Sequence, residues 1–151
     1  MAKEMTNERA IAYLDGLPAD KLVLHGAHEE YDVLRPSQPN QSHLIPEYNQ
    51  CAVYGTLFTD IALLHAVIRA PKTDWGWEVD FEKTPYLTVR GPKRLPIGVG
   101  YIHILRQSDF TSIVEPGFSC LAFKEVVPIR VIAVWPNILE LLHVLERVQF
   151  P

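Results

Sequence analysis

Twelve prolines are the feature of this 151-residue sequence that most limits its fold. An average composition would give about seven or eight. They occupy positions 18, 36, 39, 46, 71, 85, 92, 96, 116, 128, 136 and 151. Because proline removes a backbone donor and disrupts helix interiors, a chain interrupted so evenly must consist of short elements joined by defined turns. This pattern excludes a helical bundle.

The length and composition indicate one globular domain that spans residues 1–151. Hydrophobic residues make up 48% of the chain and charged residues 21%, which is ordinary for a globular domain. A chain of this size buries about 69% of its surface on folding, which is enough for a hydrophobic core that needs no disulfide or structural metal. The net charge of −4 argues against a nonspecific grip on nucleic-acid backbone.

Neither targeting nor cysteine chemistry is visible in the sequence. The first ten residues contain no apolar leader, and no apolar run approaches the roughly 20 residues that cross a bilayer. Cys51 and Cys120 do not make a disulfide framework. We therefore expect a reduced, cytoplasmic protein with no membrane partner.

Three segments carry helix signals. Residues 6–15 form a short helix within an N-terminal segment 1–18, with Thr6 or Asn7 as its cap. A second helix begins at Thr59 or Asp60 and ends before Pro71. A C-terminal helix is predicted over residues 137–150, because its apolar residues recur at helical spacing.

Short strands separate these helices. We predict them at residues 21–26, 52–55, 98–105, 119–123 and 126–134, with irregular strands or hairpins over 72–98. Residues 27–50 are polar and turn-rich, and loops of that length are usually functional. The pattern predicts an α+β fold with a mainly antiparallel sheet.

Three features could carry chemistry. His25 ends a strand next to Gly26, which exposes a ring and bare backbone able to pair with a flat amide. Tyr54 ends the next strand and offers a flat face to a heteroaromatic ring. His65 lies one turn after Ile61 on the following helix. If the Tyr54 ring stacks on a ligand, His65 is placed to contact the same ligand. Each also has a structural interpretation, as a turn histidine, a core tyrosine and a half-buried histidine.

Other familiar sites are not indicated. His25 and His28 are the one close pair of histidines, and no third ligand follows at zinc spacing, so no metal is expected. The sequence contains neither the G-x-S-x-G of a nucleophile elbow nor the G-x-x-x-x-G-K-[ST] of a P-loop.

In order and spacing, these pieces resemble the ADP-ribosyltransferase fold family. That family has a strand ending in His-Gly, a long loop, a strand ending in Tyr and a helix. It then has a strand of the gYhhhL…F type and a strand-Pro-strand. The matching pieces here are Leu24-His25-Gly26, Val53-Tyr54-Gly55-Thr56, Asp60 to Ala66, Gly100 to Leu105 with Phe110, and Val126-Val127-Pro128 leading to Val131–Val134. The resemblance implies a split, mainly antiparallel sheet with a few flanking helices.

The resemblance also implies a substrate and a set of contacts. NAD would be the substrate, and ADP-ribose would pass to an unknown acceptor (protein, nucleic acid, small molecule or water) with release of nicotinamide. His25 would hydrogen-bond the nicotinamide ribose, and the Gly26 backbone would pair with the carboxamide. Tyr54 would stack on the nicotinamide ring, with His65 as a second stacking group.

The catalytic glutamate of active family members has no direct counterpart. Its usual position falls near Ser119 or Cys120, and neither is acidic. Glu125 is the candidate, with Glu115 as the other nearby carboxylate. Four hypotheses follow: an NAD-dependent mono-ADP-ribosyltransferase, a non-catalytic nucleotide-binding module of the same fold, an RNA 2′-phosphotransferase-like enzyme, and a structural or interaction domain.

Overall fold

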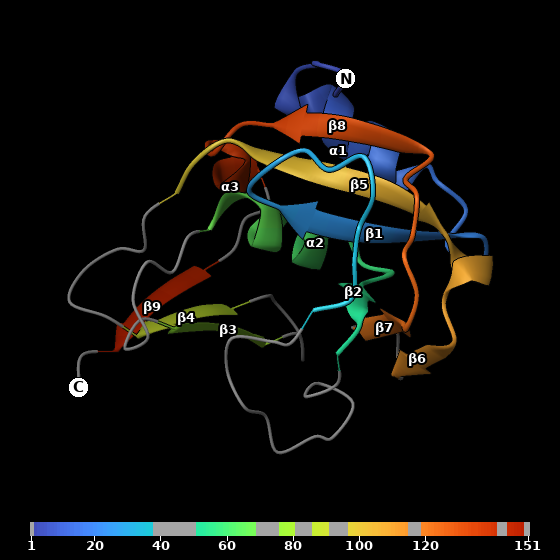
Figure 1. Ribbon diagram of the computed structural model, residues 1–151. Coiled ribbons are helices and arrows are strands. Elements are labelled where there is room, and N and C mark those ends of the chain that lie inside the picture. Colours follow the sequence, from blue (N-terminus) through green and yellow to red (C-terminus); the bar gives the residue numbers. More distant parts are fainter. Residues whose placement is uncertain are drawn as a thin grey trace.

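The computed structural model describes residues 2–37, 51–68, 76–80, 86–90, 97–114, 119–141 and 145–149. The fold is α+β (Figure 1). The helices are α1 (Asn7–Asp15), α2 (Thr59–Val67) and α3 (Ile138–Leu141). The strands are β1 (Leu22–Ala27), β2 (Val53–Gly55), β3 (Gly76–Asp80), β4 (Tyr86–Arg90), β5 (Gly100–Arg106), β6 (Ser112–Val114), β7 (Ser119–Ala122), β8 (Arg130–Val134) and β9 (Leu145–Gln149).

In the described part of the chain, the strands form three sheets of three, with the orders β1-β5-β8, β2-β7-β6 and β3-β4-β9. The pairings are antiparallel except for β4 with β9. The first two sheets meet where Leu24 of β1 exchanges two backbone hydrogen bonds with Thr56, N to O distances of 2.9 and 2.8 Å. The mainly antiparallel α+β prediction is confirmed.

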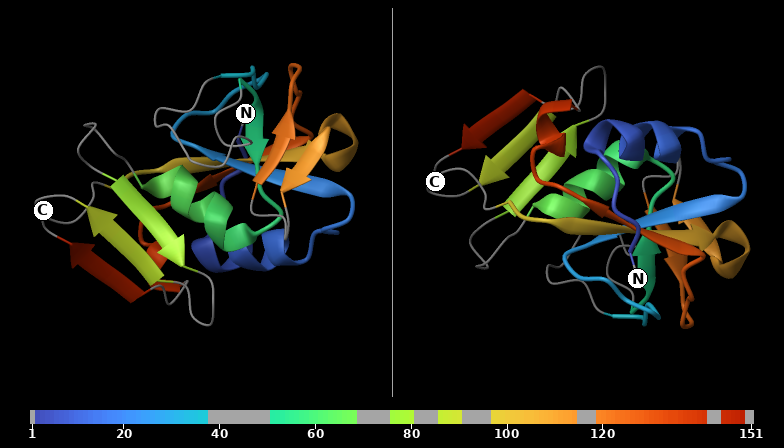
Figure 2. Two further views of the ribbon diagram at one scale, coloured as in Figure 1. Left: turned by 90° about the horizontal axis from the view of Figure 1, so that it is seen from below. Right: turned by 90° about the horizontal axis from the view of Figure 1, so that it is seen from above.

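Alternation along the β1-β5-β8 sheet separates two apolar layers. Leu24, Ile102 and Ile132 face α1 and α2, and form one core with the buried residues of those helices. Val23 and Leu105 face the other way and pack with buried residues of β2 and β7. Figure 2 shows α1 and α2 on the same side of this sheet, with the β2-β7-β6 sheet away from them.

Helix α2 is buried on most of its circumference, and two glycines allow it to lie close to the sheet. A Cβ on Gly26 would stand 2.0 Å from the carbonyl oxygen of Ala62, and one on Gly100 would stand 2.1 Å from that of Ala66. Ala62 and Ala66 are one turn apart, so the same helix face contacts two neighbouring strands. These contacts place the helix backbone directly against β1 and β5.

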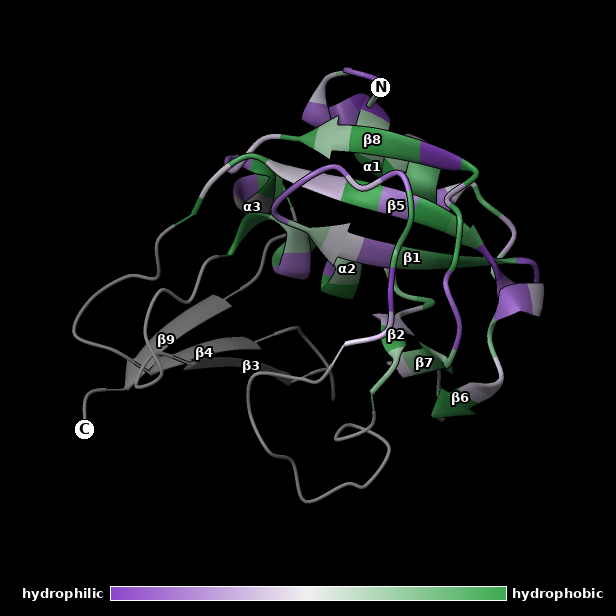
Figure 3. Cartoon of the chain, in the orientation of Figure 1, coloured by the Kyte–Doolittle hydropathy of each residue, from purple (hydrophilic) through white to green (hydrophobic). Residues whose placement is uncertain are grey.

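Segment 28–37, which we call the strap, crosses the sheet face opposite the helices (Figure 1). It is mostly polar, with an apolar stretch that includes Leu34 (Figure 3). Leu34 is buried, and it exchanges two backbone hydrogen bonds of 2.9 Å with Val126. Ser37 pairs with Ala52 in the same way. The strap thus runs from the end of β1 to the start of β2.

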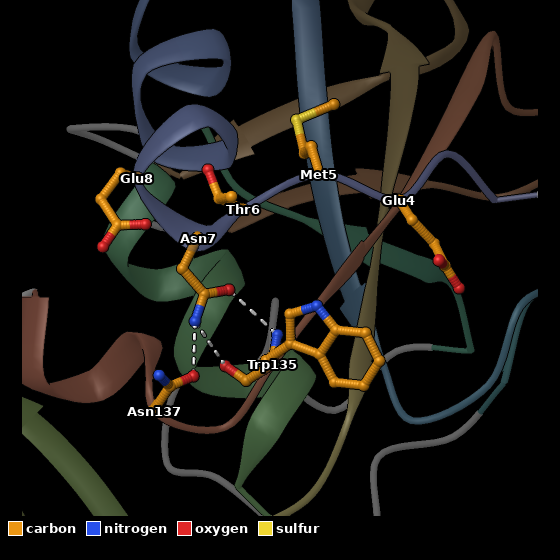
Figure 4. A pocket seen from close by; sticks show the side chains of 7 residues that line it. All are labelled: Glu4, Met5, Thr6, Asn7, Glu8, Trp135 and Asn137. Atoms are coloured by element: carbon orange, nitrogen blue, oxygen red, sulfur yellow. Dashed lines mark hydrogen bonds between the residues drawn. The ribbon is translucent and has the colours of Figure 1, made fainter.

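Thr6 caps α1, because its hydroxyl accepts a hydrogen bond from the Arg9 amide. Asn7, the other predicted cap, is a buried residue with a different task (Figure 4). Its Nδ2 donates to Asn137 Oδ1 at 2.7 Å, and its Oδ1 accepts from the Trp135 amide at 3.1 Å. Asn7 therefore ties α1 to the turn that follows β8.

Two helix predictions are wrong in detail. The N-cap of α2 is Phe58, which makes no side-chain capping bond, and Thr59 and Asp60 lie inside the helix. Among the described residues, the C-terminal helix predicted over 137–150 is limited to α3, and Leu145–Gln149 forms β9, paired with β4. Pairing with a distant strand outweighed the local helical spacing. The hairpin expected within 72–98 is present as β3 and β4.

In the part of the chain that the structure describes, no helix has both the length and the apolar character needed to cross a membrane.

Candidate functional site

His25 and Tyr54 meet at the junction of the first two sheets. The His25 ring lies on β1, and its Nδ1 donates a hydrogen bond to the backbone carbonyl of Tyr54 on β2. The adjacent Leu24–Thr56 pair brings the two strands together at this point. His25 and Tyr54 are 29 positions apart in the sequence, and the imidazole of His25 joins their two strands.

The Gly26 main chain faces the same junction. Just before β1 and just after β5, the Gln107 amide donates to the Lys21 carbonyl, so from Lys21 onward every second residue directs its amide and carbonyl groups to β5. Leu24 and Gly26 direct theirs to the β2 side. Leu24 forms its two backbone hydrogen bonds with Thr56. The Tyr54 carbonyl would be the next acceptor along β2, but it accepts from the His25 ring. Within the described residues, this leaves the Gly26 amide and carbonyl without a protein partner on that edge.

His65 lies on α2 with its side chain exposed. Its pKa is lowered to about 4, first by loss of hydration and then by the imidazoles of His25 and His28. The exposure of the residue means that water weakens the first of these effects. The backbone nitrogen of Ala66, the next residue, would lie 2.8 Å from a Cβ on Gly26, so His65 is on the part of α2 that packs beside β1.

Two further histidines complete a cluster that the sequence did not reveal. His28 Nε2 donates to the carbonyl of Ile68, at the C-terminal end of α2, over 2.8 Å. His103 of β5 is fully buried, and its ring meets that of His25 edge to face at 5.7 Å between centroids. His25 and His103 are direct partners in the antiparallel register. His43 and His143 lie outside the described residues.

The imidazoles of His25 and His103 are neutral at pH 7. Burial lowers the pKa of His25, although the Tyr54 carbonyl acts in the opposite direction. The pKa of His103 falls to about 4, mainly because of burial and then because of His25. Neutral rings can exchange hydrogen bonds with hydroxyl and amide groups, but they supply no positive charge to a phosphate.

The described histidines are not arranged as a metal centre. No group of three His, Cys, Asp or Glu side chains in the described part of the chain is arranged to hold a metal ion. The reason is visible in the hydrogen bonds, since Nδ1 of His25 and both ring nitrogens of His103 bond protein groups.

Glu125 lies on the surface between β7 and β8. Its carboxylate accepts a hydrogen bond of 3.1 Å from Nε of Arg35 in the strap, and both side chains are more than half exposed. Glu115 lies outside the described residues. Ser119 and Cys120, near which the resemblance would place a glutamate, lie on β7. Cys120 is buried opposite Gly55, and burial raises its pKa to about 11. It therefore remains an uncharged thiol.

Two hollows occur elsewhere on the molecule. The first, about 540 Å³, is lined by residues 4–8 together with Trp135 and Asn137 (Figure 4). The second, about 410 Å³, lies between the end of α1, the start of β1 and the start of α2, with Asp15 and Asp60 in its wall. Burial, and then the charge of Asp15, raises the pKa of Asp60. Neither hollow is lined by His25 or Tyr54.

Comparison with known proteins adds no relative, since no family model, curated protein or solved structure matches this chain.

Proposed function

We propose that this protein binds NAD in the manner of ADP-ribosyltransferase-like proteins, with the nicotinamide held at the junction of β1 and β2. The observation that carries the proposal is the hydrogen bond from His25 to the Tyr54 carbonyl beside the open backbone edge of Gly26. The split between the β1-β5-β8 and β2-β7-β6 sheets also supports a fold of that type.

The chemistry of the junction suits nicotinamide and its ribose. A carboxamide presents one donor and one acceptor in a plane, which matches the amide and carbonyl of Gly26. Nδ1 of His25 is engaged, so Nε2 is the atom that would bond a ribose hydroxyl. The Tyr54 ring would stack on the pyridinium, and His65 would approach from α2.

In the proposed reaction, the bond between the ribose C1′ and the nicotinamide nitrogen breaks, and an acceptor nucleophile forms a new bond to C1′ and gives up its proton to solvent. Nicotinamide leaves with the bonding electron pair, and positive charge develops on the sugar. A carboxylate would stabilise that charge. Glu125 is the residue proposed for this role, and it would have to leave Arg35 to perform it.

Binding without turnover is the second candidate, and the ion pair between Arg35 and Glu125 favours it. The uncharged Cys120 favours it too. The same ion pair occupies Arg35, a basic residue that an RNA 2′-phosphotransferase would need for a phosphate.

Calorimetric titration with NAD tests NAD binding, which the transferase and the binding module have in common. Saturable binding of NAD, with weaker binding of ADP-ribose, supports a site that recognises the nicotinamide. Equal affinity for the two ligands would contradict this placement, and no binding at millimolar NAD would reject the proposal. Release of free nicotinamide over time separates the transferase from the binding module.

A further inference from the structure

His103 makes two hydrogen bonds that link β1, β5 and the strap. Its Nδ1 lies 3.3 Å from the carbonyl oxygen of His25, and its Nε2 lies 2.9 Å from the backbone nitrogen of Tyr31. The rings of Tyr31 and His103 are also in contact, with centroids 5.8 Å apart. His103 is thus the point at which the first half of the strap is attached to the sheet.

These two partners determine the protonation state of His103. A carbonyl oxygen only accepts, so Nδ1 must carry the hydrogen. A backbone amide only donates, so Nε2 must be bare. Protonation of Nε2 would point its N–H at the backbone N–H of Tyr31 and remove the hydrogen bond between them. A neutral ring is therefore required for the attachment to exist.

We propose that His103 is a proton-sensitive latch, which holds the strap against β5 at Tyr31 when neutral and releases Tyr31 when Nε2 is protonated. The release stays local, because Leu34 is buried and paired with Val126 beyond the latch. The strap would hinge between its attachment at Tyr31 and its anchor at Leu34.

The surroundings of the latch set the pH at which it opens. His25 faces it from β1, and its imidazole disfavours a charge on His103. Glu30 acts from the strap in the opposite direction, as does the His25 carbonyl. From β8, Val131 is the register partner of His103 and adds no charge. Because burial dominates, the pKa of the latched ring is about 4, against 6.5 for a free imidazole.

The latch concerns the strap alone and stands whether or not NAD binds. Its consequence for ligands rests on the proposed function, since the strap begins three residues after His25 and covers the sheet face on which that ring lies. An open strap would change access to the proposed nicotinamide site.

Ring-nitrogen NMR of the full chain tests the premise in the unaltered protein. At pH 7, Nδ1 of His103 is expected to carry the proton and Nε2 to be bare. A proton on Nε2 at pH 7 would overturn the latch. No ligand is used, so the result is independent of NAD binding.

Amide exchange tests the release. Between pH 6.5 and 4, the protection of the Tyr31 amide relative to Leu34 should fall by up to about tenfold per pH unit, because the open state binds one more proton. A ratio that stays constant with pH would overturn the proposal. So would loss of protection at Ile104 in step with Tyr31, because the domain would then unfold as one unit.

His103→Gln is the matched variant, since its amide oxygen can accept from Tyr31 but cannot titrate. In this variant, the ratio of Tyr31 to Leu34 protection should no longer change with pH. A persisting pH dependence would assign the release to another group. If the variant does not fold, the two measurements on the unaltered chain still decide the question.

Discussion

Gly26 lies against Ala62 so closely that an added Cβ would stand 2.0 Å from the Ala62 carbonyl oxygen. The glycine that the proposed nicotinamide site uses through its backbone is therefore also required by the packing of α2. These two demands act on different sides of the residue, since the space for Cβ faces the helix and the amide and carbonyl face β2. They can be separated by experiment.

Gly26→Ala should destabilise the fold by about 3 kcal/mol or more, at or above the usual range for overpacking, because the new methyl group meets helix backbone that cannot rotate away. Urea unfolding measures the change. Gly16→Ala is the control, because Gly16 has ordinary right-handed φ and ψ, and a Cβ there would stand 3.3 Å from its nearest neighbour. That variant should change stability by less than about 1 kcal/mol. Equal effects at the two positions would refute the close contact between α2 and β1.

Tyr54→Ala should weaken NAD binding by about 1–3 kcal/mol, by analogy with the stacking of bases on aromatic side chains. Tyr54→Phe keeps the flat face and should retain most of the affinity. Calorimetry measures both, and circular dichroism establishes that the two variants are folded. An affinity unchanged by loss of the ring would remove Tyr54 from the proposed site.

Stability should fall as the pH drops from 7 to 5. The folded-state pKa values of His25 and His103 lie below the 6.5 of a free imidazole, so the folded state binds fewer protons than the unfolded state. Their contribution is complete above pH 6.5 and is lost as the pH falls toward the folded pKa, which for His103 is about 4. For His103 alone the loss reaches at most about 3 kcal/mol over that range.

Urea unfolding of His103→Gln at each pH isolates that contribution, since the variant should lose stability less steeply than the unaltered chain. Measurements are best kept above pH 5, because Asp60 has a raised pKa and stabilises the fold on acidification. Identical slopes for the two proteins would show that His103 does not titrate in this range.

Glu125→Gln should leave folding stability within about 1 kcal/mol, because exposed ion pairs such as that with Arg35 contribute little. NAD affinity should also be unchanged. Nicotinamide release should be lost if Glu125 supports the transfer, and normal release would exclude it. Lys124→Gln is the matched control, since it removes a neighbouring exposed charge that pairs with Asp109.

Local patterns predicted most elements of the fold, and distant pairings explain what they missed. The glycine after His25, the glycine after Tyr54 and the apolar run of α2 each locate an element in the sequence. The spacing from Ile138 to Val148 fits a helix equally well, yet residues 145–149 pair with β4. No local signal reports a strand partner more than fifty residues away.

The candidate site was predictable only in part for the same reason. His25, Tyr54 and His65 stand out through their local neighbours, whereas His103 faces His25 through a register that joins residues 78 positions apart. A histidine inside an alternating strand was the one available signal. The pairing of Glu125 with Arg35 depends likewise on where the strap crosses the sheet.

The contact of α2 with Gly26 and Gly100 has a mechanical consequence. Interlocking side chains can slip to another rotamer and absorb a small displacement, but main chain against main chain has no such compliance. A shift of α2 would therefore move β1 and β5 with it. The hydrogen bond between His25 and the Tyr54 carbonyl would then respond to any force that acts on the helix.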